Sequence, residues 1–284
     1  MVQSNQSNAI PLAEPGGVAK GGKKQRRSPR FPISQKAQKI LNRLLIPVAL
    51  LVVWEIVSIY KVFPPMIIPA PEKVWHNFVT QVQTGMLQKD LAVSLLRVIK
   101  GFAVGAVLGI ALGILLGISA RFNEMLSGIF NGIRQIPPIA WIPLFIVWFG
   151  VGDLSKIVLV AKGTFFPVLL NTIDGIHNAD RGHLEVAQLY RIKKVDLIRK
   201  VYFPAGVPFV FVGLRLGAGM AWMSVVAAEM LASTAGIGYR IDDAQQLMQS
   251  DEMIVDMIVI GIVGGLVDLL LKLATKRITR WKAG

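Results

Sequence analysis

The chain has 284 residues, of which 53% are hydrophobic and 17% are charged, and its mean hydropathy is +0.55. Soluble domains carry about 25% charged residues, so this composition excludes an ordinary soluble domain and indicates an all-α membrane protein. The formal net charge of +14 comes from bases near both termini and in one internal loop, which the positive-inside rule predicts and which argues against a nucleic-acid partner.

The first 41 residues predict a disordered basic cytoplasmic tail, because they are rich in Gly, Ser, Asn, Gln, Pro and bases and poor in apolar surface. Anionic membrane lipid is its expected partner. Gly17–Lys24 matches a phosphate-binding loop up to Lys23, but Lys24 replaces the required Ser or Thr and no strand precedes it, so we expect no ATP binding by this chain. With no Cys and three His at no metal-ligand spacing, we also expect no metal, no bound cofactor and no catalytic residues.

Six apolar runs follow the tail, and each can span about 30 Å at about 1.5 Å per residue. Six spans leave both termini on one side of the membrane. Bases concentrate in the tail up to Arg43, in the loop from Arg181 to Lys200 and in the C-terminus from Lys272, which places all three in the cytoplasm. The runs lie at 42–60, 97–118, 128–149, 154–175, 205–232 and 253–273.

This pattern predicts a chain of four parts. They are the tail at 1–41, a first transmembrane helix with a periplasmic segment at 42–96, a transmembrane core at 97–275 and a basic cytoplasmic tail at 276–284. The segment at 61–96 is partly amphipathic. We expect it to form one or two short helices on the outer surface, beginning after the PAPEKV turn at 69–74.

The second run carries a glycine at every fourth position. Because four helical residues turn about 400°, these glycines form one slowly drifting stripe along the helix. A stripe without side chains lets another helix approach closely, and this predicts tight packing within the bundle. A role in binding a ligand is the alternative. The stripe consists of Gly101, Gly105, Gly109, Gly113 and Gly117.

Proline interrupts the third run. Pro137 and Pro138 remove two backbone donors, and such a break is tolerated only where protein or water satisfies the freed carbonyl groups. We therefore expect Ile139–Trp141 either to line a cavity or to form a kink packed on a neighbouring helix. Trp141 is a candidate for lining a pathway across the membrane.

Ionisable residues within the fourth and fifth runs mark further candidates for that pathway. Such groups cost about 2.5–3.5 kcal/mol each at the centre of a membrane helix, so they usually face protein or water. The fifth run is the most polar, and we expect it to line the pathway through Arg215, Trp222, Ser224 and Glu229. Lys162 and Arg215 could offer positive charge to an anion. Alternatively, Lys162 pairs with Glu229 and holds two helices together.

The charged loop between the fourth and fifth runs predicts two short helices and not a simple tether. Asp180 is suited to cap a first helix that runs through Tyr190, and a second helical stretch at 194–202 is expected to end at Pro204. An apolar stripe of the kind found here predicts a helix that docks into a partner's groove. The stripe consists of Leu189, Ile192, Val195 and Ile198.

The same loop resembles the signature loop of the membrane subunits of ATP-binding-cassette (ABC) importers. That signature reads Glu-Ala-Ala, three residues, Gly, nine residues, an aliphatic residue, one residue and Leu-Pro. Glu185, Ala187, Val201 and Pro204 match it with the correct spacing. The chain departs from it at Val186, Phe203 and Arg191. The last of these replaces the Gly that allows a sharp turn between the two helices.

The resemblance extends over about residues 90–275. The segments IRQIPPIAWIPLFIVWFG, KGTFFPVLLNTIDGI, GLRLGAGMAWMSVVAAEML and GIGY are similar to those of the subgroup that imports aliphatic sulfonates, taurine, nitrate or bicarbonate. They lie at 133–150, 162–176, 213–231 and 236–239.

The resemblance implies the type I ABC importer permease fold, with six transmembrane helices and a cytoplasmic coupling helix, in the bacterial inner membrane. It implies a second copy of this chain, two ATPase subunits that bind ATP and Mg²⁺, and a periplasmic or lipid-anchored substrate-binding protein. ATP hydrolysis is expected in the separate ATPase subunit, so this chain is not an enzyme. The residues expected to couple to that subunit are Glu185, Ala187, Leu189, Tyr190, Arg191, Ile192 and Pro204.

The function implied is that of a permease that moves a small anion by alternating access, with an aliphatic sulfonate or taurine as the main expectation. Nitrate or bicarbonate is the alternative within the subgroup. A stand-alone secondary transporter is the rival from another class, with Lys162 and Glu229 as an ion relay. The rival has no need of a docking loop with Glu185 and Pro204 at the signature spacing.

Overall fold

A computed structural model describes residues 35–179, 182, 185, 187, 189–190 and 192–278, and every regular element in that part of the chain is a helix. The predictions for most of the two tails lie outside it, and the four-part division remains a prediction. Residues 51–284 form one compact unit, and the residues up to Leu50 form a separate one. Helix α1 (Gln35–Ile59) crosses that boundary, and its apolar part is Leu45–Ile59.

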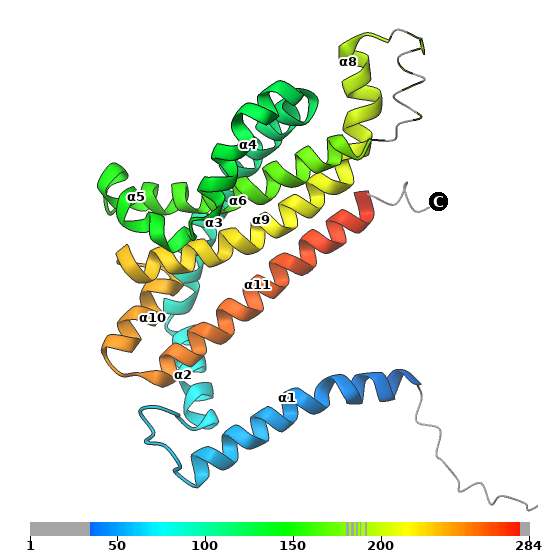
Figure 1. Ribbon diagram of the computed structural model, residues 1–284. Coiled ribbons are helices and arrows are strands. Elements are labelled where there is room, and N and C mark those ends of the chain that lie inside the picture. The colour runs from blue at the N-terminus through cyan, green and yellow to red at the C-terminus, as the bar shows by residue number, and fades with distance from the viewer. Residues whose placement is uncertain are drawn as a thin grey trace, which may run out of the picture. The chain divides into compact units, whose positions relative to one another are not determined.

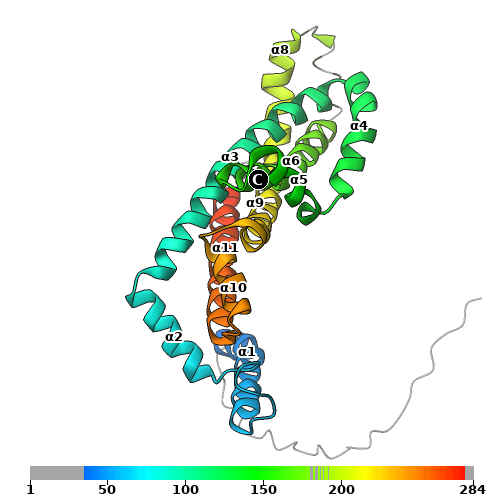
Figure 2. The same cartoon turned by 90° about the vertical axis from the view of Figure 1, so that its left-hand side faces the viewer.

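Three long helices build the core of the larger unit, namely α3 (Met86–Ile118), α6 (Asp153–His177) and α9 (Phe203–Ala232). Helix α6 packs along both α3 and α9 (Figure 1). Helix α11 (Ser250–Ile278) lies beside α9 in both views (Figures 1 and 2). Each of these four helices is long and apolar enough to cross a membrane.

The glycine stripe of the second run forms the contact between α3 and α6, which confirms the predicted packing. A Cβ atom on Gly113 would lie 2.5 Å from the Cβ of Thr172, and one on Gly109 would lie 2.9 Å from the carbonyl oxygen of Phe165. Both distances are shorter than van der Waals contact. The two backbones therefore approach to a separation that glycine permits and a side chain does not.

The third run is a broken span. Helix α4 (Ala120–Gln135) ends before Pro137, and a 3₁₀ turn (η1, Pro138–Trp141) leads into α5 (Ile142–Phe149). The bend between α4 and the segment Pro138–Phe149 is 94°. The predicted break is confirmed, because the two prolines leave no donors to carry the helix through. If the bent pair counts as one span, the described residues hold five candidate spans.

Two short helices lie at the end of the bundle where α6 begins and α9 ends, which we call the hub end. A helix is present in the predicted segment as α2 (Pro71–Gln83), and α10 (Ile237–Gln246) follows α9. Helix α2 begins at Pro71, inside the PAPEKV sequence and not after it, because proline is well suited to the first turn of a helix. Helix α3 begins well before the predicted position 97. The reason is that Leu87 and Leu91 continue its apolar face onto a cluster around Ile237.

At the opposite end, which we call the loop end, α6 stops and α9 begins (Figure 1). There α8 (Lys194–Leu197), a π-helical turn (η2, Ile198–Tyr202) and α9 follow one another without a break. Pro204 therefore does not stop the second helical stretch of the loop, contrary to the prediction. The π-helical turn just before Pro204 shifts the hydrogen-bond register around the missing donor, so the helix continues.

Candidate functional site

A cluster of charges at the hub end, which we call the ionic hub, joins the buried Arg97 of α3 and Glu229 of α9 to the exposed Asp153 of α6. Arg97 donates through Nε and Nη2 to Oδ1 of Asp153 at 2.9 and 2.6 Å, and through Nη1 to Oε1 of Glu229 at 2.8 Å. Arg97 is 7% exposed and Glu229 is 0% exposed. One guanidinium thus neutralises a fully buried carboxylate and links three helices.

The ionic hub also holds the turn between α9 and α10. Nη1 of Arg97 donates to the carbonyl oxygen of Ala235 at 2.7 Å. The Ser94 hydroxyl donates to the Glu229 carboxylate at 2.8 Å and accepts a hydrogen bond from the amide of Ile237 at 3.0 Å. The groups that bind the carboxyl group of Glu229 are therefore the same groups that fix this turn against α3.

The pairing of Lys162 with Glu229 that the sequence allowed is wrong, because Arg97 and Ser94 already occupy that carboxylate. Nζ of Lys162 donates instead to the carbonyl oxygen of Ile136 at 3.1 Å. This carbonyl belongs to the proline break, where helical partners are missing. The ammonium group of Lys162 thus satisfies a backbone group that the break exposes.

A cavity of about 220 Å³ lies beside Lys162, and we call it the break pocket. Its walls come from the broken span, from α6 and from α9. Of the described residues that line it, two are cationic and none is acidic. The lining consists of Arg134, Ile136, Pro138, Lys162, Gly163, Phe166, Pro167, Leu170 and Met220.

Trp141 packs against the neighbouring helices instead of lining this cavity. Its ring centre lies 5.6 Å from that of Phe145, and it joins an apolar cluster that includes Leu159. The Nζ of Lys162 lies 4.8 Å from the centre of the Trp141 ring, which is the geometry of a cation–π contact. Of the two alternatives for residues 139–141, the packed kink describes Trp141, and the cavity is lined by Ile136 and Pro138, which come before these residues.

Arg215 forms an ion pair with Asp268 of α11, with contacts of 2.5 and 2.8 Å. The side chains are 42% and 51% exposed, although both lie well inside helices able to span a membrane. A groove of about 860 Å³, which we call the Arg215 groove, contains this pair together with Lys272 and Lys276. Charge this exposed within a span faces protein or water and not lipid.

The other polar residues of the fifth run lie inside the helix bundle. Nε1 of Trp222 donates to the carbonyl oxygen of Ile260 on α11 at 3.2 Å. Ser224 is buried against Gly163 of α6, and its hydroxyl has no hydrogen-bond partner among the described residues. Arg215 therefore faces a groove, while Trp222, Ser224 and Glu229 do not. Their roles in a pathway remain predictions.

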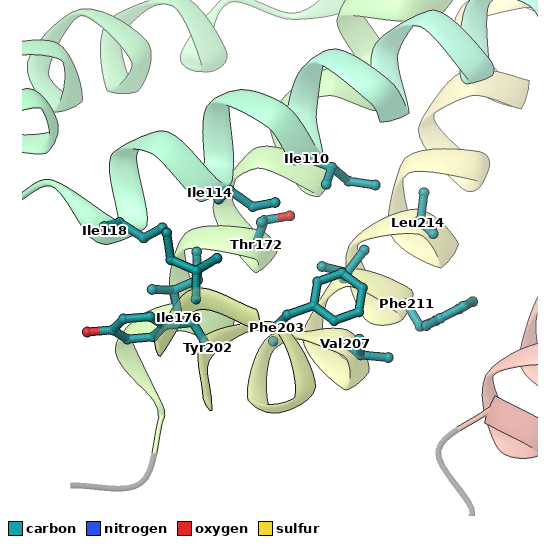
Figure 3. Close-up of a pocket in the computed structure, with 13 residues that line it drawn as sticks. Ile110, Ile114, Ile118, Thr172, Ile176, Tyr202, Phe203, Val207, Phe211 and Leu214 are labelled. Carbon is teal, nitrogen blue, oxygen red and sulfur yellow. The ribbon is translucent and has the colours of Figure 1, made fainter. Parts of the chain in front are cut away.

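A pocket of about 270 Å³ at the loop end lies between α3, α6 and α9 (Figure 3). Isoleucines of α3 line one side of it, and Phe203 and Val207 of α9 line the other. Among the described residues no charged one lines it, and the hydroxyl of Thr172 is already bonded to the carbonyl oxygen of Val168 at 2.7 Å. An anion would find no charged partner here, so this apolar pocket is a poor candidate for an anion site.

The charged loop carries an apolar tip. Glu185, Ala187 and Leu189 are helical, as the sequence predicts. Ala187 is buried, whereas Leu189 and Tyr190 are 81% and 79% exposed. Large side chains this exposed at a helix end are typical of an interaction surface.

The remaining residues of the predicted docking surface follow this tip. Ile192 is exposed, and its amide donates to the carbonyl oxygen of Ala187 at 3.1 Å. Pro204 lies in the first turn of α9. Arg191 falls outside the described residues. We call the exposed apolar residues of this surface the loop tip, namely Leu189, Tyr190 and Ile192.

The residues that form the core of the larger unit match a known sequence family. Residues 92–283 match the model of the family described as binding-protein-dependent transport system inner membrane component. The chain belongs to this family. The matched residues include the ionic hub, the break pocket, the Arg215 groove and the loop tip.

The chain is similar to permeases named for different substrates. It is 36% identical over 242 residues to the aliphatic sulfonates transport permease protein SsuC of Bacillus subtilis, covering 85% of this chain and 88% of that one. It is 30% identical over 257 residues to the taurine transport system permease protein TauC of Escherichia coli, covering 89% and 92%. It is 32% identical over 250 residues to the bicarbonate transport system permease protein CmpB of Synechococcus elongatus, covering 82% and 89%.

The fold of this transport component is also found among solved ABC transporters. An inward-facing structure of the MetNI methionine ABC transporter superposes with a TM-score of 0.61 at 19% identity, covering 70% of this chain and 97% of that chain. Similarity at this level of identity establishes the fold and leaves the substrate open.

Three residues of the ionic hub and the break pocket were not predicted from the sequence. Arg97 is the first residue of the second run, where the glycine stripe was the dominant pattern, and Ser94 lies just before that run. Arg134 lies before the proline break. The signal for Arg97 was present, because an arginine close to an apolar run of this length needs an acidic or backbone partner. Its actual partners, Asp153 and Glu229, are far away in sequence, so the pattern does not identify them.

Proposed function

We propose that this chain is the permease subunit of an ATP-driven importer that moves a small anion across the inner membrane by alternating access. The proposed substrate is an aliphatic sulfonate or taurine, and nitrate or bicarbonate is the alternative. The observation that supports an anion is the charge of the two cavities at the middle of the spans. The break pocket has two cations and no acid, and the Arg215 groove has more cations than acids.

The proposed complex contains a second copy of this chain, two ATPase subunits that bind ATP and Mg²⁺, and a periplasmic or lipid-anchored substrate-binding protein. The half-exposed ion pair of Arg215 and Asp268 supports a second copy, because it needs a protein or aqueous neighbour within the membrane. We further propose six spans with both termini in the cytoplasm. They comprise α1, the broken span and the four long helices, and the positive-inside rule supports their orientation.

We propose that the loop tip docks into a groove of the ATPase subunit, so that closure of the ATPase dimer moves the permease helices. Two features of the loop support this. Leu189 and Tyr190 expose apolar area that a soluble partner would cover, and α8 continues directly into α9 through Pro204. A push on the loop is then transmitted along the helix that carries Arg215.

The rival, a stand-alone secondary transporter, needs a relay between Lys162 and Glu229. The two residues have separate partners, since Glu229 binds Arg97 and Lys162 binds a backbone carbonyl. This arrangement leaves the relay without its proposed connection.

The test is reconstitution of the tagged chain, purified from its native membranes with its co-purifying subunits, into liposomes that contain the cognate binding protein. Uptake of labelled taurine, ethanesulfonate, nitrate and bicarbonate is measured with and without ATP. We expect ATP-dependent uptake of a sulfonate in preference to the inorganic anions. A chain that purifies without an ATPase and moves an anion in the absence of ATP would overturn the importer proposal in favour of the rival.

A further inference from the structure

The break pocket has the composition of an anion-binding site. Arg134 and Lys162 contribute two positive charges, and neither forms an ion pair within the described part of the chain. Arg97 and Arg215 have acidic partners, whereas Lys162, like the buried Lys156, donates to backbone carbonyl oxygens. Such a contact satisfies the hydrogen bonds of the ammonium group but leaves its charge unbalanced. A pocket with cations alone creates a positive potential that a bound anion would neutralise.

The rest of the pocket is apolar. Phe166, Leu170 and Met220 supply hydrophobic wall beside the two charged groups. The cavity of about 220 Å³ is many times larger than one water needs, which is roughly 10–15 Å³. This combination fits a ligand that carries a negative head and a short apolar group.

Met220 lines both the break pocket and the Arg215 groove, so one side chain separates two cation-lined spaces. The packing of α6 on α9 sets the depths of Lys162 and Arg215 along the bundle. Gly163 of α6 lies against Met220 of α9, and Gly217 of α9 lies against Thr164 of α6. Arg215 therefore lies about one helical turn, roughly 6 Å, closer to the loop end than Lys162 does.

The row of cations continues on α11. Lys272 and Lys276 line the same groove as Arg215, each about 6 Å further along the helix toward the loop end. Asp268 is the one acidic residue that lines the groove. The positive charges thus follow one another in steps of a single helical turn from the break pocket toward the loop end.

We infer that the break pocket binds a small anion with a short apolar group between Arg134 and Lys162, and that the anion leaves past Met220 into the Arg215 groove. This inference rests on the proposed import of an anion, and it identifies the residues that hold the anion within the membrane. The competing interpretation is that Lys162 does nothing more than satisfy the carbonyl group of Ile136.

The absence of Cys from the chain allows a direct test. A single thiol is introduced at Met220 (Met220→Cys) in the full chain, in native membrane vesicles with its partner subunits. Its reaction rates with anionic 2-sulfonatoethyl and cationic 2-trimethylammonioethyl methanethiosulfonate are then compared. The matched control is Gln83→Cys, an exposed position on α2 that lies outside both cavities. The ratio of the anionic to the cationic reaction rate at Met220→Cys is divided by the same ratio at Gln83→Cys. This division removes the intrinsic difference in reactivity between the two reagents.

We expect the normalised rate ratio at Met220→Cys to favour the anionic reagent at least about tenfold, since two nearby cations attract one reagent and repel the other. Adding Lys162→Met and Arg134→Gln should bring the ratio close to one. Adding Lys162→Arg, which keeps the charge, should preserve the preference. Millimolar ethanesulfonate should slow labelling, and an equal concentration of a tetraalkylammonium salt should not.

Three outcomes would overturn the inference. They are a ratio near one in the parent thiol variant, a ratio that Lys162→Met with Arg134→Gln leaves unchanged, and a thiol that reacts with neither reagent while Gln83→Cys reacts with both. These outcomes are separate from failure of the proposed function. If ATP-dependent sulfonate uptake survives Lys162→Met with Arg134→Gln, the importer proposal stands and the anion site in the break pocket is excluded. If labelling is charge-selective but no uptake depends on ATP, the anion site stands and the importer proposal is excluded.

Discussion

At the scale of single residues, the decisive interaction is the one between Arg97 and Glu229. A fully buried carboxylate is tolerated only if its charge is balanced and its oxygen atoms are hydrogen-bonded. Arg97 and Ser94 meet both needs, and Arg97 also binds Asp153 at the start of α6. Removing the guanidinium would leave the carboxyl group of Glu229 without an opposite charge and would release the turn at Ala235.

We therefore expect Arg97→Met to destabilise the protein by about 3–5 kcal/mol, the usual cost of breaking a buried ion pair from one side. In detergent, the temperature at which half of the purified chain loses its monodisperse elution should fall clearly. The matched control is Arg215→Met, which breaks the half-exposed pair with Asp268 and should cost less. Equal losses in the two variants would contradict this account of the ionic hub.

At the scale of the helices, the bundle depends on the close approach of α3 to α6. A Cβ atom on Gly105 would collide with the carbonyl oxygen of Ala161, which is backbone and cannot move aside. The same atom would lie 2.8 Å from the Cβ of Thr164. Dispersion contacts between helices supply much of the association energy in lipid, so a separation forced by one methyl group affects the whole contact.

We expect Gly105→Ala to cost about 1–3 kcal/mol through overpacking, with reduced accumulation in membranes and earlier thermal aggregation. Gly128→Ala is the matched control, because a Cβ atom on Gly128 of α4 would meet nothing within 4 Å. The control should be neutral or stabilising by up to about 1 kcal/mol, since Ala is the better helix former. The thermal stability of both variants is measured in parallel. If Gly128→Ala loses as much stability as Gly105→Ala, the close contact of α3 with α6 at Gly105 is not the cause of the loss.

At the scale of the whole molecule, the loop end and the middle of the spans are linked by one helix. From α8 to the end of α9 the chain is helical without a break, and Arg215 lies along it. A partner that binds the loop tip therefore has a rigid connection to the Arg215 groove. The ionic hub ties the far end of the same helix to α3 and α6, so α9 is held at the hub end and accessible to a partner at the loop end.

We expect the double variant Leu189→Asp and Tyr190→Asp to reduce co-purification of the ATPase subunit by at least about tenfold, because charged groups would replace the exposed apolar contacts. The chain itself should still fold, since both side chains are exposed. Tyr60→Asp, at another exposed aromatic residue just after α1, is the control and should retain the ATPase. Retention of the ATPase by the double variant would exclude the loop tip as its docking surface.

The pattern of neighbouring residues in the sequence was sufficient to predict the helical class, the apolar runs, the contact through the glycine stripe and the break at Pro137 and Pro138. Each depends on residues close together in the sequence, whose spacing alone decides periodicity, close approach or loss of a donor. The π-helical turn before Pro204 was not predictable in this way, because a proline in a helical pattern can either end the helix or be accommodated.

The sequence by itself determined that this is a helical membrane protein whose charged loop and motifs resemble those of importer permeases. The tertiary structure alone decided which charges meet. Glu229 is bound by Arg97 and not by Lys162, and this follows from how α3 and α9 pack at the hub end. Packing of distant segments sets such partners, and a buried charge binds whichever opposite charge that packing brings within reach.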